Sequence, residues 1–223
     1  MITYYILFII LSFFAYKEIN QTKPLKFNSF LLLILIFSVF IGLRNEVGCD
    51  WRGYQDLFNR VVCTKSRICE EFNNTFEYLK FKEIGFSYLN FIIKEIGGNF
   101  YHLNFILSIL FIFPILSFCS SLKRPFLAIL ISYPYLITVI GLGTIRQSIS
   151  IAFLMLCIKQ LKNYRFYNYY LYSLISLAFH YSSIFFLFLP ILINIEKDSI
   201  LKKINKYLYI VFIVLITFLI FFK

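Results

Sequence analysis

The chain has 223 residues, of which 60% are hydrophobic, and it contains 29 Phe and 17 Tyr. Its mean hydropathy of +0.78 excludes an ordinary soluble domain and indicates an integral membrane protein. The 22 Lys and Arg outnumber the 11 Asp and Glu, which gives a net charge of +11. In a membrane protein this excess belongs to cytoplasmic loops, so we expect no nucleic-acid partner.

Eight apolar segments along the chain predict an all-α fold, a polytopic helical bundle in a membrane. About 20 apolar residues span the core of a bilayer, and several of the segments are shorter than that. We expect flanking Tyr, Lys and Arg side chains to extend the short helices to the interface. The whole chain, residues 1–223, is therefore predicted to be a single transmembrane bundle. In chain order the segments are Ile2–Tyr16, Phe27–Leu43, Phe100–Phe118, Pro125–Gly143, Ile145–Leu161, Phe166–Phe179, Ser182–Ile195 and Tyr207–Phe222.

Basic clusters determine the predicted orientation, because cytoplasmic loops carry an excess of Lys and Arg. The segment Arg44–Glu83 instead balances seven basic against seven acidic residues. We therefore expect it to be an external loop, and alternation of the helices then places the N-terminus outside as well. Four clusters are assigned to the cytoplasm, namely Lys17–Lys26, Lys123–Arg124, Lys159–Arg165 and Lys197–Lys206.

The alternation of helices agrees with the basic clusters only under two further conditions. The short segment Ile84–Ile96 contains Lys94 and Glu95, so we expect an interfacial or re-entrant helix at the outer surface. The segment Phe166–Ile195 must form a hairpin that turns near His180, because a single tilted span would put the last basic cluster outside. In this arrangement polar residues from four separate segments gather at the outer surface.

Five cysteines show neither a Cys-x-x-Cys pair nor metal-ligand spacing with a histidine. We interpret them mainly as small apolar residues. If their loop faces an oxidising compartment, Cys63 and Cys69 are candidates for a local disulfide.

The stretch GLRNEVGCDWRGY, Gly42–Tyr54, places charges and aromatic rings directly after an apolar segment. A cation such as Arg44 complements the C-terminal end of a helix dipole, and this alone is enough to explain an arginine at this position. Asp50 is a candidate proton acceptor, with a solvated external loop as the alternative. Trp51 and Tyr54 are candidates for stacking on sugar faces, although anchoring at the interface explains both rings equally well.

The stretch GLGTIRQSIS, Gly141–Ser150, predicts a sharp turn followed by a helix. Its glycines let the backbone turn, and Thr144 followed by Gln147 has the form of a capping box. A helix start offers N–H groups and the positive end of its dipole to an anion. Arg146 adds a planar fork suited to phosphate oxygens, so we predict an anion site. The alternative is a plain hairpin turn in which Arg146 reaches the lipid headgroups.

His180 ends an apolar run and precedes further polar residues. An imidazole is a suitable proton acceptor near neutral pH, although a lone histidine also serves as a structural hydrogen-bonding residue. Glu83 belongs to the same predicted surface and is a candidate for a sugar contact. The sequence contains no metalloprotease, nucleophile-elbow, phosphate-loop or Cys/His metal motif. We therefore expect metal-independent chemistry carried by Arg, His and carboxylates, without a cofactor.

Four motifs in this order resemble the EpsG family of membrane proteins from bacterial exopolysaccharide and capsule loci, which is grouped with Wzy-type O-antigen and polysaccharide polymerases. The resemblance covers roughly Met1–Leu192, and each motif is weak when taken alone. Family members commonly continue through further membrane helices, which makes this chain a candidate for a truncated member. The motifs are GLRNEVGCDWRGYQDLF (Gly42–Phe58), EIGFSYLNFIIKEIGGNF (Glu83–Phe100), GTIRQSISIAFLMLCIKQL (Gly143–Leu161) and FHYSSIFFLFLPIL (Phe179–Leu192).

This resemblance implies a membrane glycosyltransferase that polymerises oligosaccharide repeat units linked to undecaprenyl diphosphate, at the outer face of the bacterial cytoplasmic membrane. The expected partners are that lipid-linked sugar, the bilayer, and other polysaccharide export or chain-length proteins. The expected roles are catalysis for Asp50 or His180, diphosphate binding for Arg44, Arg146, Thr144 and Gln147, and sugar binding for Trp51, Tyr54 and Glu83.

Two other classes of function remain open from the sequence. A transporter or flippase of lipid-linked sugars would line a path through the membrane with polar residues, whereas the candidates here gather at one face. A non-catalytic subunit of a polysaccharide synthesis complex would lack in-vitro activity.

Overall fold

A computed structural model describes residues 2–20, 25–60 and 83–192, and over these ranges the chain is helical with no strand. The predicted all-α class is confirmed. Three of the described helical stretches are long and apolar enough to cross a membrane: Ile2–Ile19, Phe100–Cys119 and Pro125–Gly143. Phe27–Gly42 is a shorter apolar helix. Together they have the character of a helical membrane protein.

The helices follow the predicted apolar segments closely over the first six of them, and the last, Tyr207–Phe222, lies outside the described residues. Their bounds are α1 (Ile2–Asn20), α2 (Phe27–Gly42), α3 (Trp51–Arg60), α5 (Ile84–Glu95), α6 (Phe100–Cys119), α7 (Pro125–Ser132), the π-helical segment η1 (Tyr133–Ile140), α8 (Gly141–Gly143), α9 (Ile145–Lys162), α10 (Phe166–Phe179), the 3₁₀ turn η2 (Tyr181–Ser183) and α11 (Ile184–Leu192).

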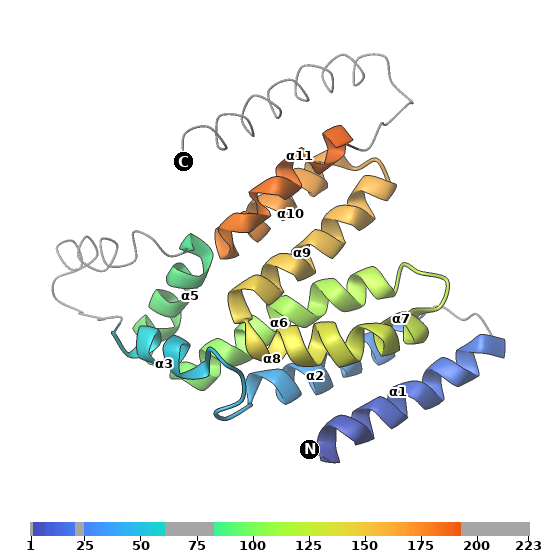
Figure 1. Cartoon of the computed structure of the whole chain (residues 1–223), viewed down its shortest axis with the longest axis horizontal. Coiled ribbons are helices and arrows are strands. Elements are labelled where there is room, and N and C mark those ends of the chain that lie inside the picture. The colour runs from blue at the N-terminus through green and yellow to red at the C-terminus, as the bar shows by residue number, and fades with distance from the viewer. Residues whose placement is uncertain (1, 21–24, 61–82, 193–223) are drawn as a thin grey trace.

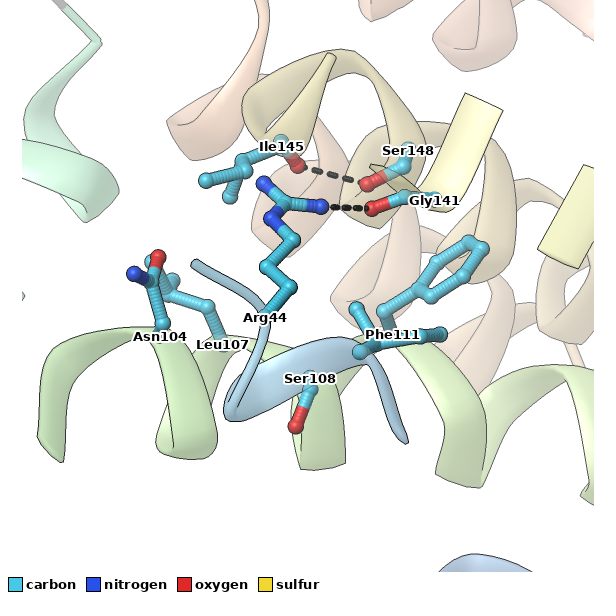
Figure 2. A pocket seen from close by; sticks show the side chains of 9 residues that line it. Arg44, Asn104, Leu107, Ser108, Phe111, Gly141, Ile145 and Ser148 are labelled. Carbon is cyan, nitrogen blue, oxygen red and sulfur yellow. Dashed lines mark hydrogen bonds between the residues drawn. The ribbon is translucent and has the colours of Figure 1, made fainter. Parts of the chain in front are cut away.

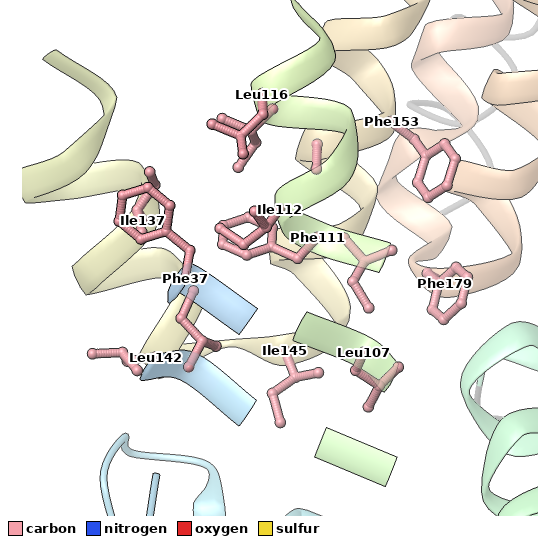
Figure 3. Packing of buried hydrophobic residues seen from close by; sticks show 14 of the residues in the cluster. Phe37, Leu107, Phe111, Ile112, Leu116, Ile137, Leu142, Ile145, Phe153 and Phe179 are labelled. Atoms are coloured by element: carbon pink, nitrogen blue, oxygen red, sulfur yellow. The ribbon is translucent and has the colours of Figure 1, made fainter. Parts of the chain in front are cut away.

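Helix α6 forms the centre of the bundle, with α2 and α9 packed against it (Figure 1). Its residues Leu103, Ile112, Ile115 and Leu116 are fully buried. Figure 3 shows side chains of α6 meeting Phe37 of α2 and residues from the later helices. Since lipid is as apolar as a leucine side chain, close packing is what holds such helices together. The core therefore fixes where the ends of α2, α9 and α10 lie.

The outer face of α1 is apolar and is not covered by the other described helices. Ile2, Tyr5, Ile9 and Phe13 recur every three or four residues and are 76%, 66%, 65% and 54% exposed. A patch of this kind on a soluble protein would be an aggregation risk. On a membrane helix it is the face that meets lipid.

The two ends of the bundle differ in charge. Glu18 at the end of α1 accepts a hydrogen bond from the backbone N–H of Leu127 (3.0 Å), in the first turn of α7. Lys159, near the end of α9, donates to the carbonyl oxygen of Ser117 (2.8 Å), near the end of α6. The basic clusters beside these contacts therefore share one end, whereas α3 and α5 lie at the other (Figure 1). Which end faces the cytoplasm stays a prediction.

The expected hairpin at His180 is present. Helix α10 ends at Phe179, His180 is extended, and α11 returns along α10. The Tyr169 hydroxyl on α10 donates to the carbonyl oxygen of Phe186 on α11. The segment 84–96, predicted as an interfacial helix, contains α5; its depth relative to a bilayer stays a prediction.

The segment predicted as an external loop, 44–83, contains the amphipathic helix α3. Its apolar side chains Trp51, Tyr54 and Phe58 are buried in the core cluster. A spacing of three and four residues puts all three on one helix face. Asp50 is half-buried and Arg52 is exposed, so the choice between a proton acceptor and a solvated loop charge at Asp50 stays open. Cys63 and Cys69 lie outside the described residues.

The predicted capping box at Thr144 and Gln147 is wrong. The Thr144 side chain makes no capping hydrogen bond, and its backbone has ψ near 86°. An N-cap normally has an extended backbone that brings its side chain over the first turn. Asn99, with ψ near 178°, meets this requirement and forms a capping box with His102 at the start of α6.

Candidate functional site

Helix α3 gathers two arginines that are about a hundred residues apart in the chain. Trp51 and Tyr54 lie one turn apart on the same face of α3. The guanidinium of Arg44 is 5.6 Å from the centre of the Trp51 ring. That of Arg146 is 5.4 Å from the centre of the Tyr54 ring. Cation–π contacts of this kind hold a planar guanidinium over each ring.

Arg44 is 6% exposed and comes directly after Leu43, the residue that caps α2. Its Nη1 atom donates to the carbonyl oxygen of Gly141 (2.7 Å), which ties the end of α2 to the turn before α9. Burial lowers the pKa of Arg44 to about 10, so the side chain stays cationic at neutral pH. The loop after Arg44 also packs on this turn, since Gly48 lies against the carbonyl oxygen of Leu142. Gly48 has a φ of +107°, which a glycine adopts readily.

Arg146 is the second residue of α9 and is more accessible than Arg44. Its Nη1 atom forms an ion pair with Glu83, and its Nε atom donates to the Tyr54 hydroxyl at 3.3 Å. The side chain of Arg146 is 28% exposed, against 7% for that of Glu83. Burial raises the pKa of Tyr54, so its hydroxyl is neutral at neutral pH. The guanidinium is thus held by two partners, while part of the side chain stays exposed.

Glu83 connects three segments of the chain. It directly precedes α5 and uses one carboxylate oxygen for Arg146 on α9. The other oxygen lies 2.9 Å from Nδ1 of His180 at the end of α10. A buried carboxylate is favourable only when it is paired and hydrogen-bonded in this way. Glu83 was predicted to contact sugar; the described structure makes it the link between an arginine and a histidine, and the sugar contact stays a prediction.

His180 is oriented by that carboxylate. Its backbone N–H still bonds to the Ser176 carbonyl oxygen of α10, while its φ of −156° turns the side chain away from the helix. The side chain is 32% exposed. When Nδ1 donates its proton to Glu83, Nε2 carries the lone pair. In that tautomer Nε2 is the ring atom that can accept a proton.

The other predicted site residues lie near this centre but are not bonded into it. Asp50 is half-buried at the start of α3, and its charge acts on Tyr54. Within the described ranges no hydrogen bond joins it to Arg44 or His180. Thr144 is half-buried and Gln147 is exposed. Trp51 is 2% exposed and packs on Phe100, so in this arrangement it supports Arg44 and offers no free face to a sugar.

One polar residue near the site was missed. Asn104 lies on α6 and is 3% exposed. The sequence did contain a signal, because a polar amide inside an otherwise apolar membrane segment is costly and usually functional. Among the described residues no three His, Cys, Asp or Glu side chains are placed to hold a metal ion.

Comparison with known proteins gives one informative result. The model of the EpsG family matches residues 27–223, which is most of the chain. No curated protein and no solved structure matches it.

Proposed function

The chain belongs to the EpsG family, and we propose that it is a polysaccharide polymerase of the bacterial cytoplasmic membrane. In this proposal it is a glycosyltransferase whose donor and acceptor are oligosaccharide repeat units linked to undecaprenyl diphosphate. The site faces outward, and the basic end of the bundle faces the cytoplasm, in agreement with the charge bias of cytoplasmic loops. The observation that carries the proposal is the joining of Arg146, Glu83 and His180, from three separate segments, at one end of the bundle.

The reaction requires one bond to form and one to break. An acceptor hydroxyl attacks the anomeric carbon of the donor sugar and loses its proton. The bond between that carbon and the diphosphate oxygen breaks, and the oxygen keeps the electron pair. A catalyst therefore needs a proton acceptor at one position and stabilisation of negative charge at another.

Arg146 is suited to the leaving diphosphate. Its guanidinium is held by Tyr54 and Glu83 yet stays partly exposed, and its planar fork matches phosphate oxygens. It also sits in the first turn of α9, where N–H groups and the helix dipole favour an anion. Gln147 and Thr144 flank it and are proposed to line the same phosphate position. Arg44 adds a second, deeper positive charge.

His180 is the better supported of the two candidate bases. The carboxylate of Glu83 orients its ring and stabilises the imidazolium that forms when Nε2 takes the proton. Asp50 has no such orienting partner among its described contacts. Glu83 is thus proposed to be a positioning residue, with Tyr54 and Trp51 supporting the two arginines.

A matched pair of histidine variants tests this assignment. His180→Gln removes the base, so extension of a purified lipid-linked repeat unit should fall by about 10² to 10⁴. His102→Gln is the control, because glutamine can take the histidine's part in the capping box at Asn99, and its activity should stay normal. Asp50→Asn should cost far less than His180→Gln. Equal activity of wild type and His180→Gln would remove His180 from the chemistry, and inactivity of the purified wild type would favour a non-catalytic subunit.

A further inference from the structure

A small cavity lies beside Arg44, between α6, the end of α2 and the start of α9 (Figure 2). Its volume is about 10 Å³, which is room for about one particle of the size of a water molecule. The polar groups at its wall come from Arg44, Asn104, Ser108 and Ser148, and its lining contains no Asp or Glu. The cavity is distinct from the ion-paired centre at Glu83.

The charge of Arg44 has no carboxylate to balance it within the described part of the chain. Its Nη1 atom is used by Gly141, and its buried Nε atom has no hydrogen-bond partner among the described residues. The groups whose fields act on it are Tyr54, Tyr4 and Cys49, and none of them is a carboxylate. A buried cation in this situation is strongly destabilising unless an anion joins it.

Asn104 supplies a second unused donor at the same cavity. Neither Nδ2 nor Oδ1 has a hydrogen-bond partner in the described ranges, although the residue is 3% exposed. The hydroxyl protons of the neighbouring serines are already used. Ser148 donates to the carbonyl oxygen of Ile145, and Ser108 donates to that of Ser38. Figure 2 shows Asn104 on the side of the Arg44 guanidinium that faces away from Gly141. A buried amide left unpaired loses the hydrogen bonds that it makes to water in the unfolded chain, which destabilises the fold.

We propose that this cavity is an anion subsite that holds one small anionic atom between Arg44 and Asn104. An anion neutralises the buried charge, which a water molecule cannot do, and it accepts hydrogen bonds from both unused donors. The atom is either a halide ion from solution or one non-bridging oxygen of a diphosphate; the second source rests on the proposed function.

The test uses the purified full chain in neutral detergent with sodium gluconate as the only salt. Chloride or inorganic pyrophosphate is then added at constant ionic strength, and unfolding is followed by tryptophan fluorescence. Trp51 is the single tryptophan and packs under Arg44, so its emission at 25 °C also reports binding directly. We expect the unfolding midpoint to rise by about 5 to 11 °C at an anion concentration of one hundred times the dissociation constant.

Asn104→Ala should abolish this rise. Gln160→Ala is the matched control, because Gln160 is also buried with an unpaired oxygen but lies near the other end of α9, and it should keep the full response. A response to chloride identifies the halide, and a response to pyrophosphate alone identifies the diphosphate oxygen. The proposal is overturned if neither anion changes the wild-type midpoint or emission, or if Asn104→Ala responds like wild type. Neither result would bear on the extension assay, which tests the proposed function separately.

Discussion

Several residues at this site each make more than one polar contact. Arg146 pairs with Glu83, bonds to the hydroxyl of Tyr54 and still exposes part of its fork. Glu83 in turn orients His180. Such reciprocal pairing offsets the free-energy cost of burying a carboxylate in an apolar bundle, and it holds each group in one position.

Arg146→Lys tests whether the planar fork matters at this scale. A lysine keeps the charge but supplies a compact ammonium that cannot bond to Tyr54, Glu83 and a phosphate oxygen in the same geometry. We expect about 10² to 10³ loss in the rate of repeat-unit extension, with normal accumulation in the membrane. Arg124→Lys, an exposed position at the basic end, is the control and should be fully active. Polymer of normal length and amount from Arg146→Lys would rule out this role.

At the scale of helices, the contact between α9 and α10 determines whether the site can form. The hydroxyls of Ser150 and Ser176 lie 2.8 Å apart, and that of Ser176 also donates to the carbonyl oxygen of Ser150 at 3.0 Å. Small residues at such a contact let two membrane helices approach closely. Arg146 precedes this contact on α9, and His180 follows it on α10.

Substitutions at Ser176 should separate size from hydrogen bonding. Ser176→Ala keeps the close approach and should lower stability by only about 0.6 kcal/mol, with activity retained. Ser176→Leu places a large side chain at a position that is 0% exposed, so α10 must move and activity should be lost. Thermal unfolding and the extension assay measure the two effects. Full activity of Ser176→Leu would show that the spacing of α9 and α10 is not needed.

At the scale of the whole molecule, the candidate site lies at one end of the bundle and the described basic clusters lie at the other. The site is formed by α3, the start of α5, the start of α9 and the end of α10 (Figure 1). An enzyme that works at one membrane face needs no polar path through the bilayer. A transporter would need one.

Cysteine labelling at the two ends of α9 tests the orientation. In a background without the five native cysteines, Gln147→Cys and Lys162→Cys each place one thiol at an exposed position. We expect a membrane-impermeant maleimide to label position 147 in intact cells and to reach position 162 only after permeabilisation. The reverse pattern would put the site in the cytoplasm, and labelling of position 147 from both sides would favour transport.

Sequence alone determined the class of this protein and most of its helices. Apolar run length and the distribution of Lys and Arg are local properties, so they identified α2, α6 and the turn at His180 without knowledge of packing. The helix within 44–83 was missed because α3 is short, with a polar side and an apolar face. The capping box at Thr144 failed because the backbone there has ψ near 86°, which differs from the extended conformation of a capping residue.

Only the tertiary structure decided which polar groups meet. Arg146 and His180 lie 63 and 97 residues after Glu83 in the chain, and no local pattern specifies that one carboxylate joins them. Likewise, Trp51 and Tyr54 were assigned to sugar because aromatic rings serve many purposes; burial under the two arginines gave them a supporting role. Contacts of this kind depend on how α3, α5, α9 and α10 pack around α6, which is a property of the whole bundle.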